Sequence, residues 1–354
     1  MHILELKAYR KKLAIKRPYT IARNTFFDAE VVFLEVKLAN GMVGFGSSAT
    51  DVDVVGESAE DTINNLTSEI VQSLVGHDIR EFNKIIQDIR LQFPKHPGTQ
   101  AAIDLALHDA FGQWLGISVL DFYGRRHQKM LTSVTIGIKN VVDTLAEAQE
   151  YYDSGFKVLK VKTGIDPEED AERIIKLREK YHDYFRIRVD ANTGYDAAKL
   201  QLFLDQTAGQ EVELVEQPFP PGMESDLMQF PEPVRRLLAA DESLKNAKSA
   251  LALAKDMPYG IFNIKLMKCG GIAGALEIAN IAKQADISLF WGCNDESMVS
   301  ITGALHVAFS CAHTQYIDLD GSFDLAEDVV KDGFTLEDGY LIPNERAGLG
   351  LILL

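Results

Sequence analysis

Charged residues recur along the chain at a nearly constant spacing, each at the end of a short apolar run. They are Lys162 in VLKVKTG, Asp190 in RIRVDAN, Glu216 in VELVEQP, Asp241 in LLAADES and Lys265 in FNIKLMK. From Lys162 onward the steps are 28, 26, 25 and 24 residues, about the length of one strand, one helix and two loops. Such a repeat predicts a parallel α/β barrel, whose strands carry their C-terminal residues to one shared site.

Three of these residues, Asp190, Glu216 and Asp241, are carboxylic acids on consecutive predicted strands. Three carboxylates in one pocket repel one another unless a cation neutralises them. A hard divalent ion suits oxygen ligands of this kind, with Mg²⁺ preferred over Mn²⁺ or Ca²⁺. The alternative is that each acid only caps the helix that follows it. Three acids in phase favour the metal site, because barrel ends are where sites are built.

Lysines flank the acids. Lys160 and Lys162 are two residues apart on a predicted strand, so their side chains point to the same face. Repulsion between them is expected to lower their pKa values, so that one acts as a base while the other binds a carboxylate. Lys265 is expected on roughly the opposite side of the ring. Two bases facing one carbon could remove a proton from one side and return it from the other. The alternative is that the lysines only form ion pairs with the acids.

The elements that position these residues fall into two blocks. Residues 2–16 and 30–38 are predicted strands, Asn40-Gly41 signals a hairpin, and helical patterns cover 58–75, 79–92 and 98–115. Eight further strands are predicted at 133–138, 158–162, 186–190, 212–216, 237–241, 261–265, 287–292 and 315–319. Helical periodicity fills the seven segments between them. We therefore expect a (β/α)7β TIM-like barrel at 126–320, an α+β capping domain at 1–125, and a tail at 321–354 that completes the cap.

Composition excludes several classes of partner. The net charge of −16 argues against nucleic acid and against acidic membranes, since both attract basic surfaces. Three cysteines with no paired spacing fit a reducing cytosol, and no apolar run approaches the ~20 residues of a membrane span. We expect a cytoplasmic protein. A homo-oligomer is also expected, because many barrels of this kind assemble.

The KxK pair, the three acids and the lysine of IKLMKCGG together resemble the enolase superfamily, in its muconate-lactonizing-enzyme-like branch. The last predicted strand reads YIDLDGS, and Asp318 and Asp320 in it resemble the DxD signature of the dipeptide epimerases. In that family the pair binds the substrate ammonium, a role that suits two fixed carboxylates. The alternative is a helix-capping acid pair at the barrel rim. The use of a Lys or His base with Mg²⁺ to stabilise an enediolate is long established for the superfamily.

The resemblance implies an isomerase with a role for each residue. Asp190, Glu216 and Asp241 would bind Mg²⁺, while Lys162 and Lys265 exchange the α-proton of the C-terminal residue of a dipeptide. Lys160 and the metal would hold the substrate carboxylate and stabilise the enediolate, while Asp318 and Asp320 hold the ammonium. The resemblance also marks three substrate-lining positions: Thr135, Cys293 with the stretch to Glu296, and Arg23 in YTIARNT.

The stretch Gly292-Cys293-Asn294-Asp295-Glu296 replaces a GSMIE-like stretch of family members that act on Ala-Glu. Such members are expected to use the position of Arg23 to hold the glutamate side chain. Here Asp295 would repel that carboxylate or pair with Arg23. A small neutral dipeptide such as Ala-Ala, linked to peptidoglycan turnover, is therefore predicted, with an L-Ala-D/L-Glu epimerase as the alternative. Further alternatives are an N-acylamino-acid racemase, an o-succinylbenzoate synthase, a cycloisomerase, and a non-catalytic metabolite-binding barrel.

Overall fold

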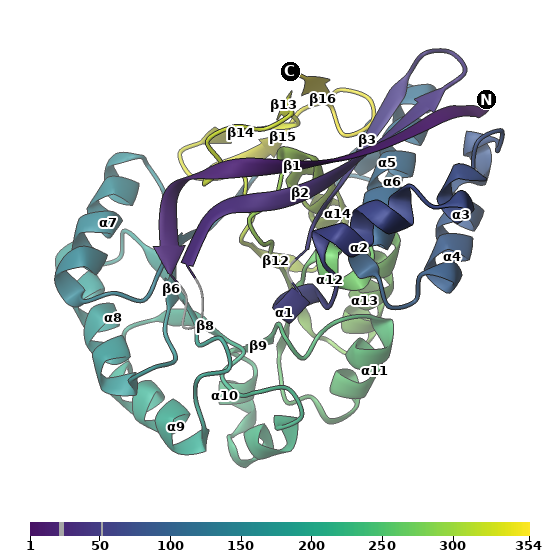
Figure 1. Cartoon of the computed structure of the whole chain (residues 1–354). Helices are drawn as coiled ribbons and strands as arrows, with labels where there is room; N and C mark the ends of the chain where they lie inside the picture. The colour runs from purple at the N-terminus through teal and green to yellow at the C-terminus, as the bar shows by residue number, and fades with distance from the viewer. Residues whose placement is uncertain (21–24, 51) are drawn as a thin grey trace.

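The computed structural model describes residues 1–20, 25–50 and 52–354, so Arg23 lies outside the described residues. A curled sheet with helices α7 to α13 around its outside forms the larger part of the molecule (Figure 1). The long strands β1 and β2 lie across it, beside the C-terminal strands (Figure 1).

The N-terminal part is an antiparallel meander followed by helices. Its strands are β1 (Ile3–Thr20), β2 (Thr25–Leu38) and β3 (Val43–Ala49), with β2 in the middle. The helices that follow are α1 (Val52–Val55), α2 (Ala59–Leu66), α3 (Glu69–Gln72), η1 (Ile79–Glu81), α4 (Phe82–Gln92), α5 (Pro97–Leu115) and α6 (Val119–Tyr123). The prediction of one helix over 58–75 was wrong. Two short helices occur because the Ser68 side chain accepts a hydrogen bond from the N–H of Val71 and starts a new one.

Helix α5 is buried along almost its whole length and packs on β3. The approach is close at Gly46, where a Cβ atom would lie 1.8 Å from the carbonyl oxygen of Ala102. Only glycine fits at that position. The helix is thereby placed between the meander and the barrel helices α12 and α13, which it also contacts.

Eight parallel strands form the barrel in sequence order. They are β5 (Val134–Ile136), β6 (Val158–Lys162), β7 (Arg186–Asp190), β8 (Val212–Glu216), β9 (Leu238–Ala240), β10 (Ile261–Ile264), β11 (Ser288–Trp291) and β12 (Thr314–Ile317). A parallel bridge between Thr132 and Ile317 joins the two ends of the sheet. The (β/α)7β barrel with a cap in front is confirmed, and each strand lies where the apolar runs predicted it.

Helices cover the outside of the sheet. They are α7 (Val141–Asp153), α8 (Pro167–Tyr181), α9 (Ala197–Gln206), η2 (Glu224–Gln229), α10 (Glu232–Arg235), α11 (Ala247–Asp256), α12 (Leu266–Cys269), α13 (Ile272–Gln284) and α14 (Met298–Ser310). Local capping starts several of them: the side chains of Asn140, Asp166 and Asp196 accept backbone N–H groups at the starts of α7, α8 and α9. The βα loops therefore begin at set positions, which keeps the strand ends in register.

The tail returns to the N-terminal part. It contains β13 (Val330–Asp332), β14 (Phe334–Glu337), β15 (Tyr340–Pro343) and β16 (Leu351–Leu353), and β15 also pairs with β4 (Met130–Leu131). The N–H of Lys16 donates to the carbonyl of Asp324 at 2.7 Å, and the N–H of Ala326 donates to that of Ala14 at 2.7 Å. The domain limits at 125 and 320 stay a prediction. Among the described residues, no helix has both the length and the apolarity to cross a membrane.

Candidate active site

The C-terminal ends of the barrel strands bring the predicted residues together. In the parallel register Lys162 of β6 lies beside Asp190 of β7, which lies beside Glu216 of β8. Asp241 is the first residue after β9, and Lys265 is the first after β10. The order in the chain thus becomes an arc of alternating charge at one end of the barrel.

Lys160 lies at the centre of this arc with only 3% of its surface exposed. Its Nζ atom is 2.8 Å from Glu216 Oε2, 2.9 Å from Asp318 Oδ2 and 3.2 Å from Asp190 Oδ2. Burial disfavours the ammonium, but the charges of Asp318, Glu216 and Asp190 outweigh it and raise the pKa of Lys160 well above its usual value. The expectation that the lysine pair lowers this pKa was wrong, because the carboxylates are nearer than the second lysine is influential.

The two predicted bases contact different carboxylates. The Nζ of Lys162 lies 2.7 Å from Asp190 Oδ2 and donates to Asn192 Oδ1 at 3.0 Å. The Nζ of Lys265 lies 2.9 Å from Asp241 Oδ2. Burial favours the neutral amine of Lys265, yet the charge of Asp241 prevails and its pKa is raised. The lysines are therefore held apart, on opposite flanks of the acids.

Lys268 belongs to the same cluster and was not predicted. Its Nζ donates to both Oδ1 and the carbonyl oxygen of Asp241. Although burial alone would raise the pKa of Asp241, Lys265 and Lys268 together hold that pKa well below its usual value. The signal was present in IKLMKCGG, where Lys268 follows Lys265 by about one helical turn and so shares its face.

The carboxylates themselves have divergent pKa values. Burial and the charge of Asp190 raise the pKa of Glu216 to about 8, whereas Lys162 and Lys160 overcome burial and lower that of Asp190 to about 2. Glu216 also accepts a hydrogen bond of 2.6 Å from Asn263. In the described part of the chain, no three acids already form a grouped metal site, and lysine ammonium groups lie against their oxygens.

This donor set suits a divalent cation in its chemistry. All three acids are buried, they sit on adjacent strands, and the raised pKa of Glu216 reflects the cost of gathering negative charge in one place. Mg²⁺ prefers such carboxylate oxygens. Lys160 and Lys265 already provide positive charge against the same oxygens, so a bound ion would compete with them.

Asp318 and Asp320 lie just beyond β12, with Thr135 and Cys293 beside them. Asp318 Oδ1 accepts a 2.6 Å hydrogen bond from Ser133 Oγ, and Asp320 Oδ2 accepts one of 3.0 Å from the N–H of Thr135. The thiol of Cys293 lies 3.8 Å from Asp320 Oδ1. Burial, then the charge of Asp318, raises the pKa of Asp320 well above its usual value. Asp318 thus bonds protein groups, while Asp320 carries the unmet demand for a cation.

The β11–α14 loop closes this side of the site. Glu296 is buried, accepts a 2.9 Å hydrogen bond from the N–H of Asn294, and has its pKa raised to about 7 by burial. Asp295 is half-buried in the same loop. Its predicted pairing with Arg23 concerns a residue outside the described ranges.

One buried cation beneath the site also escaped prediction. Arg188, two residues before Asp190, donates from Nη1 to the carbonyl of Ile317 at 2.7 Å and to Ser133 Oγ at 3.1 Å. Its Nε lies 3.0 Å from Glu213 Oε2. Because Ser133 in turn holds Asp318, Arg188 supports the position of that acid from within the barrel.

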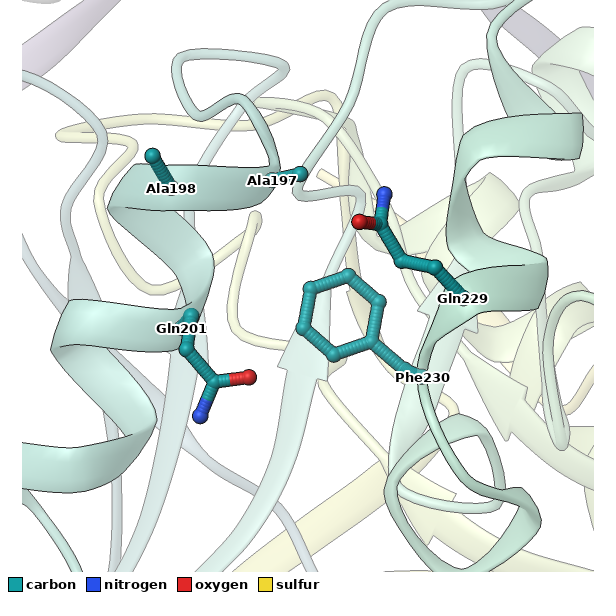
Figure 2. Close-up of a pocket in the computed structure, with 5 residues that line it drawn as sticks. All are labelled: Ala197, Ala198, Gln201, Gln229 and Phe230. Carbon is teal, nitrogen blue, oxygen red and sulfur yellow. The ribbon is translucent and has the colours of Figure 1, made fainter.

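Two cavities elsewhere are separate from this cluster. One of about 400 Å³ lies between α9 and η2, lined by Ala197, Ala198, Gln201, Gln229 and Phe230 (Figure 2). The other, of about 220 Å³, is lined by Glu232, Arg235, Arg236, Lys255, Asp256, Met257, Tyr259 and Gly260. Neither is lined by a residue of the charged arc, so the arc remains the candidate site.

Two family models together match most of the chain. The N-terminal domain of the mandelate racemase and muconate lactonizing enzyme family matches residues 3–124, and the enolase C-terminal domain-like family matches residues 143–353.

Named relatives match along their whole length. An L-Lys-D/L-Arg epimerase of Desulforapulum autotrophicum is 46% identical over 99% of this chain and 99% of its own. A crystal structure of a dipeptide epimerase from Methylococcus capsulatus, complexed with Mg and the dipeptide L-Arg-D-Lys, has a TM-score of 0.97 at 44% identity, covering 99% of this chain and 100% of that one. A hydrophobic dipeptide epimerase of Enterococcus faecalis is 31% identical over 99% of each chain. The chain therefore belongs to the mandelate racemase and muconate lactonizing enzyme branch of the enolase superfamily, in its dipeptide epimerase family, and is an isomerase.

Proposed function

We propose that this protein is a Mg²⁺-dependent dipeptide epimerase that inverts the Cα of the C-terminal residue, with Lys162 and Lys265 as the two bases. The observation that carries the proposal is the placement of these lysines on separate carboxylates, Asp190 and Asp241, at one end of the barrel. The names of the relatives support the reaction class.

Asp190, Glu216 and Asp241 are the residues that would hold Mg²⁺, an ion also present in the structure of the Methylococcus relative. When bound, it supplies positive charge for the substrate carboxylate. Lys160 contributes a second positive charge, and its raised pKa keeps it an ammonium throughout. Fixed charges of this kind stabilise the negative charge that develops when the α-proton leaves.

Proton transfer then needs one neutral and one charged lysine. The neutral amine removes the α-proton and leaves an enediolate, and the opposite ammonium returns a proton to the other face of the same carbon. Contact with Asp241 holds Lys265 in its charged form. This contact must therefore loosen before Lys265 acts as the base.

Asp318 and Asp320 would bind the substrate ammonium. Burial and like charge already raise the pKa of Asp320, and a cation beside it relieves both unfavourable effects. A substrate without an N-terminal ammonium has nothing to offer these acids. This argument favours dipeptides over N-acyl amino acids and over the substrates of cycloisomerases.

For the substrate side chains we propose Lys and Arg, in place of the small neutral residues predicted from the sequence. Two observations support the change. Relatives at 46% and 44% identity are L-Lys-D/L-Arg epimerases. Asp295, which would repel a substrate carboxylate, attracts a cationic side chain for the same reason. An Ala-Ala-like substrate stays the alternative prediction.

The test is α-proton exchange in D₂O with Mg²⁺. Four substrate pools would be compared by mass spectrometry: Lys- and Arg-containing dipeptides, Ala-Ala, Ala-Glu, and N-acetyl or N-succinyl amino acids. We expect deuterium on the C-terminal residue, fastest in the cationic pool. Exchange confined to N-acyl amino acids would show that Asp318 and Asp320 have been misread. Exchange fastest in Ala-Ala would reject the cationic side chains but keep the reaction.

A further inference from the structure

The segment that follows Lys265 is one short turn. The carbonyl of Lys265 accepts the N–H of Lys268 at 3.0 Å, and α12 ends at Gly270 and Gly271 before α13 begins at Ile272. Both lysines that contact Asp241 are therefore carried by this turn. Its position depends on what holds its far end.

Asp104 of α5 holds that end from outside the barrel. The fully buried carboxylate accepts the N–H of Ile272 at 2.8 Å on Oδ1 and that of Ala273 at 3.1 Å on Oδ2. Gly271 precedes α13 and has no side chain to cap it, so the cap comes from another helix. The fit is close: Gly271 has φ 93°, and a Cβ there would lie 2.6 Å from the Cβ of Asp104.

Other residues of the N-terminal domain reinforce this contact. His108 Nδ1 lies 3.1 Å from Asp104 Oδ1, and its Nε2 is 2.6 Å from the hydroxyl of Tyr123. A Cβ on Gly270 would lie 2.2 Å from Gln100 Oε1. Further along, Arg90 forms a bidentate ion pair with Glu277 of α13, with both distances 2.7 Å.

The turn after Lys162 is held differently, from within the barrel. Asp170 Oδ2 accepts the N–H of Gly164 at 2.9 Å and the hydroxyl of Tyr195 at 2.7 Å. Arg173, paired with Asp170, donates to the carbonyl of Lys162 at 3.0 Å. The two bases thus depend on two buried aspartates in different parts of the molecule.

We infer that Asp104 is a positioning residue for Lys265: by capping α13, the N-terminal domain sets the geometry of one of the two proton-transfer half-reactions, while Asp170 sets the other. The inference rests on the proposed function, because it assumes that Lys162 and Lys265 serve opposite faces of the substrate. Asp104 touches neither substrate nor metal in this scheme. Its loss would displace Lys265 relative to the α-carbon and leave Lys162 in place.

The experiment measures each half-reaction separately. L-Arg-L-Lys and L-Arg-D-Lys are incubated singly with saturating Mg²⁺ in D₂O, and initial deuterium uptake is recorded for each epimer. Lys265→Ala identifies the epimer whose proton faces Lys265. Asp104→Asn is expected to slow the uptake of that epimer by about tenfold or more, since small displacements of a reacting group are costly, and to leave the other within about twofold. Asp170→Asn is the matched control and should show the opposite asymmetry.

Equal slowing of both epimers by Asp104→Asn, or no slowing, would overturn the inference while the proposed function stands. No uptake in either epimer by the unmodified enzyme would overturn the proposed function, and this inference with it. If Asp104→Asn fails to fold, as judged by circular dichroism, Gln100→Ala replaces it. That variant loosens the contact at Gly270, and the same asymmetry is expected.

Discussion

The Nζ atom of Lys160 lies 2.9 Å from Oδ2 of Asp318, although the two residues are 158 positions apart in the chain. One was predicted to hold the carboxylate of a dipeptide and the other its ammonium. In the structure the two ends of the binding site neutralise each other. A zwitterionic substrate could replace this contact with one new ion pair at each end, so that no buried charge is left without a partner.

Asp318→Asn should therefore weaken substrate binding more than it weakens proton transfer. The substrate ammonium loses a charge-assisted bond of about 1.5–3 kcal/mol, so KM for dipeptides should rise roughly tenfold or more. Steady-state kinetics would show the rise. With an N-acetylated dipeptide, which has no ammonium, the difference between the variant and the parent should vanish. A penalty that persists there would mean that Asp318 does not contact the ammonium.

Substitution of either base should abolish epimerisation while each spares one exchange reaction. Lys162→Ala and Lys265→Ala are each expected to slow epimerisation by about a hundredfold to ten thousandfold, the range that a positioned base contributes. Polarimetry measures epimerisation, and mass spectrometry measures exchange. If Lys265→Ala equilibrated both epimers at the parent rate, the two-base scheme would be wrong.

Asp295→Ile should reduce the preference for cationic side chains. Removing one negative charge near the pocket is expected to lower kcat/KM for a Lys- or Arg-containing dipeptide relative to Ala-Ala by about tenfold, equivalent to ~1.4 kcal/mol. Relative kcat/KM from competition assays measures the change. Asp286→Asn is a matched control, because Asp286 precedes the same strand at its other end and its side chain is 97% exposed. An unchanged preference in Asp295→Ile would remove Asp295 from the specificity argument.

Mg²⁺ should stabilise the folded protein through the buried acids. At a hundredfold excess over its dissociation constant, a ligand specific for the folded state adds about 2.7 kcal/mol to the free energy of unfolding. Calorimetry should therefore show a higher Tm with Mg²⁺, and EDTA should reverse it. Glu216→Gln is expected to lose most of this shift. If Glu216→Gln kept the full shift, the ion would bind elsewhere.

His306 predicts an acid-sensitive stability. It lies buried on α14, and neither ring nitrogen has a hydrogen-bond partner among the described residues. Burial, assisted by the charge of Arg125, lowers its pKa to about 3, whereas an unfolded chain has a histidine pKa of ~6.5. The unfolded state therefore takes up the proton first as the pH falls. The stability that neutral His306 contributes is complete above pH ~6.5 and is lost toward pH 3, by up to ~1.4 kcal/mol per pH unit.

Urea denaturation between pH 7 and pH 4 tests this dependence. His306→Leu should flatten the decline, while His77→Gln, at an exposed histidine, should leave it unchanged. Parallel declines in His306→Leu and the parent protein would show that other groups govern the acid limb.

Much of the fold follows from local patterns. The apolar runs that end in Lys162, Asp190, Glu216, Asp241 and Lys265 mark five strands of the barrel, because strand length and the βα period are properties of neighbouring residues. The same patterns placed the other strands and the order of the sheet. The split of 58–75 into two helices was missed, since the cap at Ser68 competes with a helical periodicity that continues through it.

The sequence by itself determined the barrel, the three acids at adjacent strand ends and the lysines on either side of them, because a repeat of about 25 residues dictates where parallel strands stop. Only the tertiary structure decided which charges meet. The Lys160–Asp318 pair, the grip of Lys268 on Asp241 and the capping of α13 by Asp104 join residues up to 168 positions apart. The raised pKa of Lys160 has the same origin: in a buried site the protonation state reflects the sum of all nearby charges, and closure of the barrel sets that sum.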